Sequence, residues 1–325
     1  MSHLSRREFL AALPLVVAAT ACRQPPYAGG NFSLPSRSAV GLFPATSYGA
    51  DLADVIFRGL EILKPAVAGK RVFLKPNMVE YEPGTPINTD PMVVAGAAQA
   101  FLRAGAREVL VGEGPGHRRD IEYLLTATGM HDRLVDLKIR FVDLNHDDVA
   151  VRPLRSQFMG LESIALPVEL LRSDFIVSLP KLKTHHWAGM TASMKNFFGV
   201  VPGAVYGWPK NLLHFRGIPQ SILDLVATVR PHFTIVDAIT CMEGDGPIMG
   251  RARPLGFLAM GGDLVAVDAT CARIIGLDPA KMEYLAWGSE FLGNIAVRRI
   301  DQRGESPGRY RTVFDVVEHI KPLRG

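Results

Sequence analysis

The chain has 325 residues, of which 48% are hydrophobic, so it is long enough to bury a large core. Its 36 Lys and Arg residues against 32 Asp and Glu residues give a net charge of +4, and so small an excess argues against a nucleic-acid-binding protein. With only three cysteines, the chain cannot build a zinc site or an iron–sulfur cluster held by four thiolates.

Residues 1–21 have the pattern of a twin-arginine signal peptide. Arg6 and Arg7 precede an apolar stretch, residues 9–21, that is too short to span a bilayer. Such a signal predicts export by the twin-arginine translocase after folding, often around a cofactor. An amphipathic first helix is the structural alternative, but Pro14 fits poorly inside one.

Two processing outcomes are open at the end of the signal. Residues 19–21, Ala-Thr-Ala, fit ordinary cleavage, whereas Cys22 directly after them fits a lipoprotein acceptor. We favour the lipid anchor, which predicts a periplasmic protein attached to the membrane only through Cys22. Residues 22–45 are then expected to form a tether, since proline and glycine follow Cys22 closely. Cys241 and Cys271 either pair or remain two buried thiols, and the second outcome is the more common.

Beyond residue 45, short β-rich runs alternate with helical patterns. This alternation predicts an α/β domain over residues 46–325, with a mostly parallel sheet and helices on both faces in three layers. The expected strands are 71–74, 108–111, 139–142, 174–179, 232–236, 255–260 and 296–300. The expected helices, bounded by capping residues, glycine or proline, are 91–104, 218–230 and 264–276. Two lobes that meet near residues 150 to 175 remain an alternative.

Ligands of such sheets bind beyond the carboxyl ends of the strands. The first of the expected strands runs directly into Lys75 and Asn77, and lysine suits a carboxylate or a phosphate, although a solvated strand end is the alternative. Asp90 fits a helix cap better than a ligand. Glu113 ends the next strand in a glycine-rich turn that lacks the spacing of a dinucleotide or phosphate-binding loop, so its role as ligand or base is a weak signal.

The strongest signal is residues 178–196, SLPKLKTHHWAGMTASMKN. We expect strand 174–179 to deliver this basic segment into a loop, with Thr191 capping a following helix whose free amides help to bind an anion. Histidines there can bind a metal or carry a proton. The alternative is a solvated basic loop. The side chains concerned are Lys181, Lys183, His185, His186, Lys195 and Asn196.

A further segment, residues 237–250, carries three carboxylates among glycines. Asp237 ends an expected strand, and Glu243 and Asp245 follow it. Carboxylates clustered in this way suit a divalent cation, although Asp and Gly are also common turn formers. The sequence therefore predicts a metal held by these three residues, of unknown identity.

These motifs together carry a resemblance. LKPN, SLPKLKTHHWAGMTASMKNFFGVVPG, VDAITCMEGDGPIMG and GGDLVAVDATCARIIGLDP, with His214 between them, resemble the domain of unknown function family 362. The resemblance extends from about Lys70 to Ile300 and implies the fold and the positions of the motifs, but no substrate. Many relatives also carry ferredoxin-like cysteine motifs that this chain lacks, so no electron-transfer role is carried over.

The sequence thus predicts an exported enzyme that performs metal-assisted chemistry on a small anionic molecule. The chain lacks a serine elbow, a phosphate-binding loop and a paired zinc-ligand helix motif, so nothing in it supports a hydrolase or a kinase. A lipid-anchored protein that binds an anion without transforming it is the alternative, and a purely structural lipoprotein is a third. The expected ligand-binding residues are Lys75, Asn77, Lys181, Lys195 and Asn196; the catalytic ones are His185, Lys183 and His214; the metal ligands are Glu243, Asp245 and Asp237.

Overall fold

The computed structural model describes residues 25–49, 51–116 and 120–325. The predicted signal peptide and the predicted lipidation residue Cys22 lie outside these residues. Within them, no helix is both long enough and apolar enough to cross a membrane.

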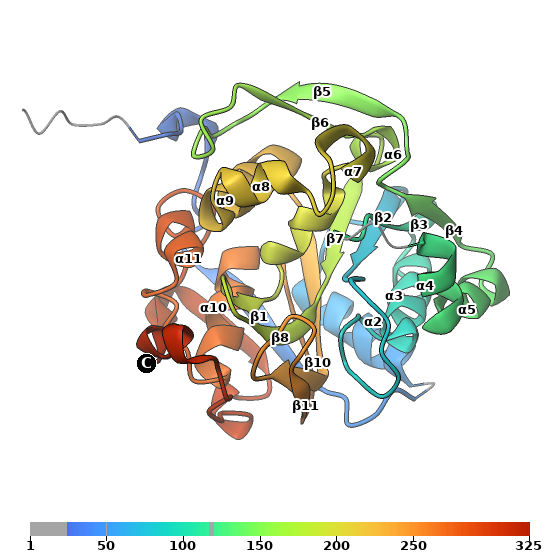
Figure 1. The fold of residues 1–325 in the computed structure, drawn as a ribbon. Coiled ribbons are helices and arrows are strands. Elements are labelled where there is room, and N and C mark those ends of the chain that lie inside the picture. The colour runs from blue at the N-terminus through green and yellow to red at the C-terminus, as the bar shows by residue number, and fades with distance from the viewer. Residues whose placement is uncertain (1–24, 50, 117–119) are drawn as a thin grey trace, which may run out of the picture.

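A ten-stranded sheet forms the centre of the molecule (Figure 1). Eight strands follow the order β12-β1-β11-β10-β7-β2-β3-β4, β8 pairs with β10, and β9 pairs with β8. The run from β10 to β4 is parallel, whereas β11 is antiparallel to both β10 and β1. The strands are β1 (Ser38–Pro44), β2 (Arg71–Pro76), β3 (Glu108–Glu113), β4 (Arg140–Asp143), β7 (Phe175–Leu179), β8 (Lys181–His185), β9 (Gly189–Thr191), β10 (Phe233–Glu243), β11 (Arg251–Gly261) and β12 (Ile300–Gly304).

Helices cover both faces of this sheet, which confirms the predicted α/β fold (Figure 1). One face carries α2 (Leu52–Leu63), α3 (Pro91–Arg103), α4 (Ile121–Ala127) and α5 (Met130–Asp136). The other carries α8 (Asn211–Phe215), α9 (Ile218–Val229), α10 (Leu264–Ile274) and α11 (Glu283–Gly288). Shorter helices are α6 (Val168–Leu171), α7 (Gly203–Tyr206), η1 (Gly29–Asn31), η2 (Lys195–Val200), η3 (Val297–Arg299), η4 (Pro307–Arg309) and η5 (Glu318–Leu323).

The core lies on both sides of the sheet. In β2, Val72 and Leu74 pack in the cluster that includes α2 and α3, while Phe73 between them packs in the cluster that includes α9 and α10. Successive side chains of a strand point to opposite faces, so a strand covered on both faces is apolar throughout. This is why the strand is visible in the sequence as a continuous apolar run.

The helix caps follow the sequence. Asp90 precedes α3 and its carboxylate accepts a hydrogen bond from Met92 N at 2.8 Å, as predicted. Asp263 precedes α10 in the same way and accepts from Ala266 N at 3.0 Å. Both helices therefore begin where a carboxylate satisfies an unpaired backbone amide.

Two predictions about the ends of the chain are wrong. Residues 38–44, predicted to belong to the tether, form β1 between β11 and β12. Gly41 and Pro44 are residues typical of a loop, which is why the sequence did not indicate a strand here. In the structure, Gly41 has no Cβ and so leaves room for the Phe43 ring. The strand predicted over residues 296–300 is instead η3, and β12 begins only at Ile300.

Residues 149–167, near which two lobes were expected to meet, contain a small antiparallel sheet of β5 (Val149–Pro153) and β6 (Ser163–Pro167). It lies apart from the large sheet, near α6 and α7 (Figure 1). Cys241 and Cys271 are both buried and unpaired, in agreement with the more common of the two outcomes considered.

The basic segment after β7 is a strand and not the predicted loop. Pro180 interrupts the chain, and β8 then continues beside the later part of β10, with Lys181 paired to Asp237 in register. Asp237 N donates to Pro180 O at 2.8 Å and fixes this transition. The step places the basic side chains of β8 beyond the end of β7, where ligands of parallel sheets bind.

Candidate functional site

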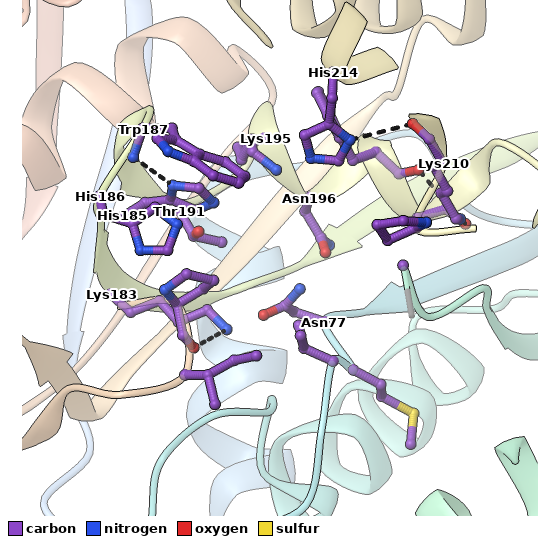
Figure 2. Close-up of a pocket in the computed structure, with 18 of the residues that line it drawn as sticks. Asn77, Lys183, His185, His186, Trp187, Thr191, Lys195, Asn196, Lys210 and His214 are labelled. Atoms are coloured by element: carbon purple, nitrogen blue, oxygen red, sulfur yellow. Dashed lines mark hydrogen bonds between the residues drawn. The ribbon is translucent and has the colours of Figure 1, made fainter. Parts of the chain in front are cut away.

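A cavity of about 610 Å³ opens at the ends of β2 and β3 and along β8 (Figure 2). Its other walls come from η2, α8 and the loop after β10. Of the residues predicted from sequence, those that line it are Asn77, Glu113, Lys183, His185, His186, Lys195, Asn196, His214 and Asp245. The remaining ones, Lys75, Lys181, Asp237 and Glu243, lie outside its wall. The fold therefore brings residues from several distant segments to one place.

Lys183 and His185 reach the cavity from the same strand, because residues two apart in β8 point to one side. The Lys183 ammonium is fully buried and donates to Ile87 O at 2.6 Å and Pro247 O at 3.2 Å. Burial, with the nearby charge of Lys195, holds the pKa of Lys183 well below its usual value. The structure thus keeps a lysine here without a carboxylate to neutralise it.

Lys195 lies in η2 and is partly buried at the cavity wall. Its Nζ sits 3.7 Å from the centroid of the Phe198 ring. Burial, together with the charge of Lys75, lowers the pKa of Lys195 to about 7. At neutral pH this side chain is divided between ammonium and free amine, so it can give or take a proton.

Lys210 was not predicted from sequence. Its Nζ donates to the carbonyl oxygens of Gly114 at 2.7 Å, Gly199 at 3.0 Å and Phe198 at 3.3 Å. Burial lowers the pKa of Lys210 to about 7 in spite of the favourable charge of Glu113. No residue pattern around it signals this role, because its acceptors are backbone atoms of distant segments.

His185 is a neutral hydrogen-bond donor at the cavity wall. Its Nδ1 accepts from Trp187 N at 3.1 Å and Ala188 N at 3.3 Å, so the ring proton is on Nε2. Burial and the nearby Lys195 hold its pKa well below 6.5. The ring therefore stays uncharged at neutral pH and presents an N–H group.

In His214, by contrast, Nδ1 carries a proton, because it lies 3.2 Å from Lys210 O and a carbonyl oxygen only accepts. The ring meets Trp187 edge to face, with centroids 5.6 Å apart. The two imidazoles that line the cavity therefore differ at Nδ1, which accepts in His185 and donates in His214.

Asn196 and Asn77, which both line the cavity, differ in whether their hydrogen-bonding groups have partners. Asn196 donates to Lys75 O at 2.9 Å and Ser178 Oγ at 3.1 Å, and accepts from Lys75 Nζ at 3.2 Å. Asn77 is only 8% exposed, and its buried Oδ1 has no partner among the described residues. An unpaired buried polar atom costs about 1–3 kcal/mol, which a hydrogen-bond donor of a ligand in the cavity can offset.

Two of the predicted anion-binding lysines are neutralised inside the protein. Lys75 donates to Glu113 at 2.7 Å, and Lys181 donates to Asp237 at 2.5 Å. Although burial opposes it, Asp237 raises the pKa of Lys181 above its usual value. Gly199 of η2 packs so closely on the first pair that a Cβ would lie 2.0 Å from Glu113 Oε1. These two pairs connect side chains at neighbouring strand ends.

The three predicted metal ligands do not come together. Asp237 binds Lys181, Glu243 Oε1 lies 3.1 Å from Arg251, and Asp245 lies 3.0 Å from His186. Over residues 25–49, 51–116 and 120–325, no group of three or more His, Cys, Asp or Glu side chains is placed to hold a metal ion. Each of these carboxylates has a basic partner, so they do not form a common ligand set.

The predicted anion site at a helix start is wrong. Lys195 and Asn196 begin a short 3₁₀ helix without a side-chain cap, and Thr191 ends β9 instead. The amides before it are already bound, since Ser193 N and Met194 N donate to Asp268 at 2.7 and 3.0 Å. The buried Asp268 carboxylate thus occupies the place that an anionic ligand was expected to take.

Comparisons with known proteins identify relatives of this chain. The family model described as "Domain of unknown function (DUF362)" matches residues 72–273. A thylakoid-associated protein of Synechocystis sp. is 31% identical over 226 residues, which cover 67% of each chain.

Two solved structures are similar at the level of the chain trace. The lactate racemase apoprotein of Thermoanaerobacterium thermosaccharolyticum has 12% identity and a TM-score of 0.40, covering 69% of this chain and 56% of that one. A protein of Thermotoga maritima has 14% identity and a TM-score of 0.36, covering 68% and 57%. This chain therefore spans a little over half the length of either structure.

Proposed function

The chain belongs to the DUF362 family, and we propose that it is an enzyme that binds a small anionic molecule in the cavity and transfers a proton to or from it. One observation carries the proposal. Lys183, Lys195 and Lys210 line the cavity, and none of them has a carboxylate within 4 Å among the described residues. Lys75 and Lys181, which lie outside the cavity wall, each have one.

The energetic argument follows from this contrast. A buried ammonium group without a counter-ion is costly, and the protein lowers the cost by lowering the pKa of the lysine. An anion near the three lysines would favour their charged forms. Lys183 and Lys195 could also donate charge-assisted hydrogen bonds of about 1.5–3 kcal/mol each, whereas the three N–H groups of Lys210 already donate to carbonyl oxygens. We therefore expect the cavity to favour a negatively charged group.

The two histidines supply the proposed proton transfer. His185 presents Nε2–H and can polarise an oxygen of the bound anion, while His214 lines the same cavity and is the side chain that we propose to carry the proton. Lys195, whose pKa is about 7, can act as either acid or base. This part of the proposal involves only residues that line the cavity.

We further propose that the protein is exported by the twin-arginine route and held to the membrane through a lipid on Cys22. Arg6, Arg7 and Cys22 support this proposal, and so does the thylakoid association of the Synechocystis relative. Replacing both arginines by lysine should stop periplasmic accumulation. Unchanged accumulation by a route independent of the twin-arginine translocase would contradict it.

Binding is tested by calorimetry of phosphate and of a panel of small carboxylates with wild type, Lys195→Gln and Lys321→Gln. Lys321 is an exposed lysine paired with Glu318, so its loss should leave binding unchanged. Loss of Lys195 should weaken binding at least tenfold, as expected for one charge-assisted contact. Equal binding by all three proteins would overturn the proposal.

Proton transfer is tested by NMR in D₂O, as deuterium uptake at the carbon next to the carboxylate of each bound acid. His214→Gln should keep binding and lose the exchange. If every acid that binds fails to exchange in the wild type, a protein that binds an anion without transforming it becomes the better account.

A further inference from the structure

The cavity is much larger than the charged group that its lysines would hold. Its volume is about 610 Å³, whereas one water molecule occupies about 30 Å³ of the liquid, and acetate or phosphate needs only a few times that volume. Cavities of about 300–1,000 Å³ accommodate ligands with a substantial body. Most of the space is therefore available to a part of the ligand that the lysines do not contact.

The part of the wall nearest to solvent contains large apolar side chains beside the exposed Asp245 and Asn211. Trp187 is 62% exposed and Met249 is 79% exposed, and both line the cavity together with Ile248, Val79 and Pro209. Exposing large apolar side chains to water costs free energy. Two of them lining one cavity therefore indicate a surface that a ligand covers.

The Trp187 ring is held in place by its neighbours. It meets His186 at 4.6 Å between centroids and an angle of 76°, and His214 at 5.6 Å and 75°. Figure 2 shows it beside Lys195 and His214, so one ligand can contact the indole and the charged groups together. An ordered aromatic wall next to cationic groups fits a ligand that has an anionic end and an apolar end.

We propose, on the basis of the function proposed above, that the ligand is the anion of an apolar acid. Its carboxylate or phosphate group lies among Lys183, Lys195 and Lys210, and its aromatic or branched aliphatic body lies against Trp187 and Met249. Lysine side chains bind a carboxylate and a phosphate through the same kind of charge-assisted contact, so the experiment includes both head groups.

The test is calorimetry of the purified full chain with two series of ligands. The carboxylate series is acetate, butyrate, hexanoate and phenylacetate, and the phosphate series is inorganic phosphate and phenyl phosphate. Each methylene that becomes buried should tighten binding by about fourfold, corresponding to about 0.8 kcal/mol. The head group that gives the tighter complex identifies the class of acid.

The variants separate the two parts of the ligand. Trp187→Ala should weaken phenylacetate about tenfold and leave acetate unchanged, because only the apolar body contacts the indole. Lys195→Gln should weaken every member of both series. Val297→Ala is the control, since Val297 is 66% exposed but does not line the cavity.

The outcomes distinguish this inference from the proposed function. If acetate binds as tightly as phenylacetate, or if Trp187→Ala weakens both equally, the inference is overturned while Lys195-dependent anion binding still stands. If Trp187→Ala weakens binding of the protein to anionic lipid vesicles but not to the acids, the exposed ring contacts a membrane and the inference is again overturned. If no acid and no phosphate binds, both proposals fail.

Discussion

Replacing Lys195 by Met should change how the stability of the protein depends on pH. In the folded protein the pKa of Lys195 is about 7, whereas in an unfolded chain it returns to the ordinary value of about 10.5. Between these values the unfolded chain holds a proton that the folded protein has released, so a rise in pH favours folding. Below about pH 7 both states are protonated, and the full cost of burying the ammonium is present.

The size of the effect follows from linkage. One proton difference gives a slope of about 1.4 kcal/mol per pH unit, so wild type should gain up to about 2.7 kcal/mol from Lys195 between pH 8 and pH 10. These values are upper limits, since the side chain is only partly buried. Lys195→Met lacks this contribution, and no hydrogen bond of the Lys195 ammonium to another described residue is lost. The variant should therefore be more stable than wild type at pH 8, with a difference that shrinks toward pH 10.

Urea unfolding at pH 8, 9 and 10 measures this difference directly. Lys321→Met serves as the control, because Lys321 is an exposed lysine and should give the wild-type slope. Saturating phosphate should flatten the wild-type slope, since a bound anion raises the pKa of the ammonium in the folded state. Parallel curves for wild type and Lys195→Met would refute the reasoning, because Lys195 would then titrate as an ordinary surface lysine.

Four other outcomes can be measured. Lys181→Met should destabilise the protein by about 3–5 kcal/mol in thermal or urea unfolding, because it leaves Asp237 buried without its partner, and the double variant with Asp237→Leu should recover most of the loss. Asp268→Ala should cost about 2 kcal/mol in urea unfolding, as two backbone amides lose their acceptor. Asn77→Ala should leave the unfolding free energy within about 1 kcal/mol of wild type in urea unfolding, because the Asn77 Oδ1 has no partner among the described residues. Mass spectrometry of the exported protein should show a diacylglyceryl group on Cys22, and a Cys22→Ser variant should not partition into membranes.

The sequence predicted the parts of the fold that are determined locally. Strands buried on both faces, such as β2 and β7, are continuous apolar runs, and helices such as α3 begin at a capping carboxylate. β1 was missed because glycine and proline interrupt its pattern, and β8 because polar side chains dominate it. The strand character of β8 comes from its pairing with β10 and β9, which no local pattern contains.

The candidate site could be predicted in composition but not in the roles of its members. The basic segment indicated the region, and Lys183, His185 and Lys195 do line one cavity. The partners of Lys75 and Lys181 are carboxylates 38 and 56 residues away in the chain, so only the folded structure reveals that these two lysines are neutralised. Lys210 acquires its surroundings from three backbone carbonyls, which have no signature in the sequence.

Lys181 and Lys183 show most directly how the fold divides residues of one type between structure and function. They lie two positions apart in β8, and both are buried. Lys181 meets the Asp237 carboxylate of β10, which raises its pKa, whereas Lys183 meets only the carbonyl oxygens of Ile87 and Pro247, and its pKa falls. Lys181 keeps its charge because the Asp237 carboxylate balances it. Lys183 has no such partner among the described residues, so burial favours its uncharged form, and an anion that entered the cavity would favour the charged form again. The position of one carboxylate on β10 therefore separates a lysine that stabilises the fold from one whose charge would depend on a bound anion.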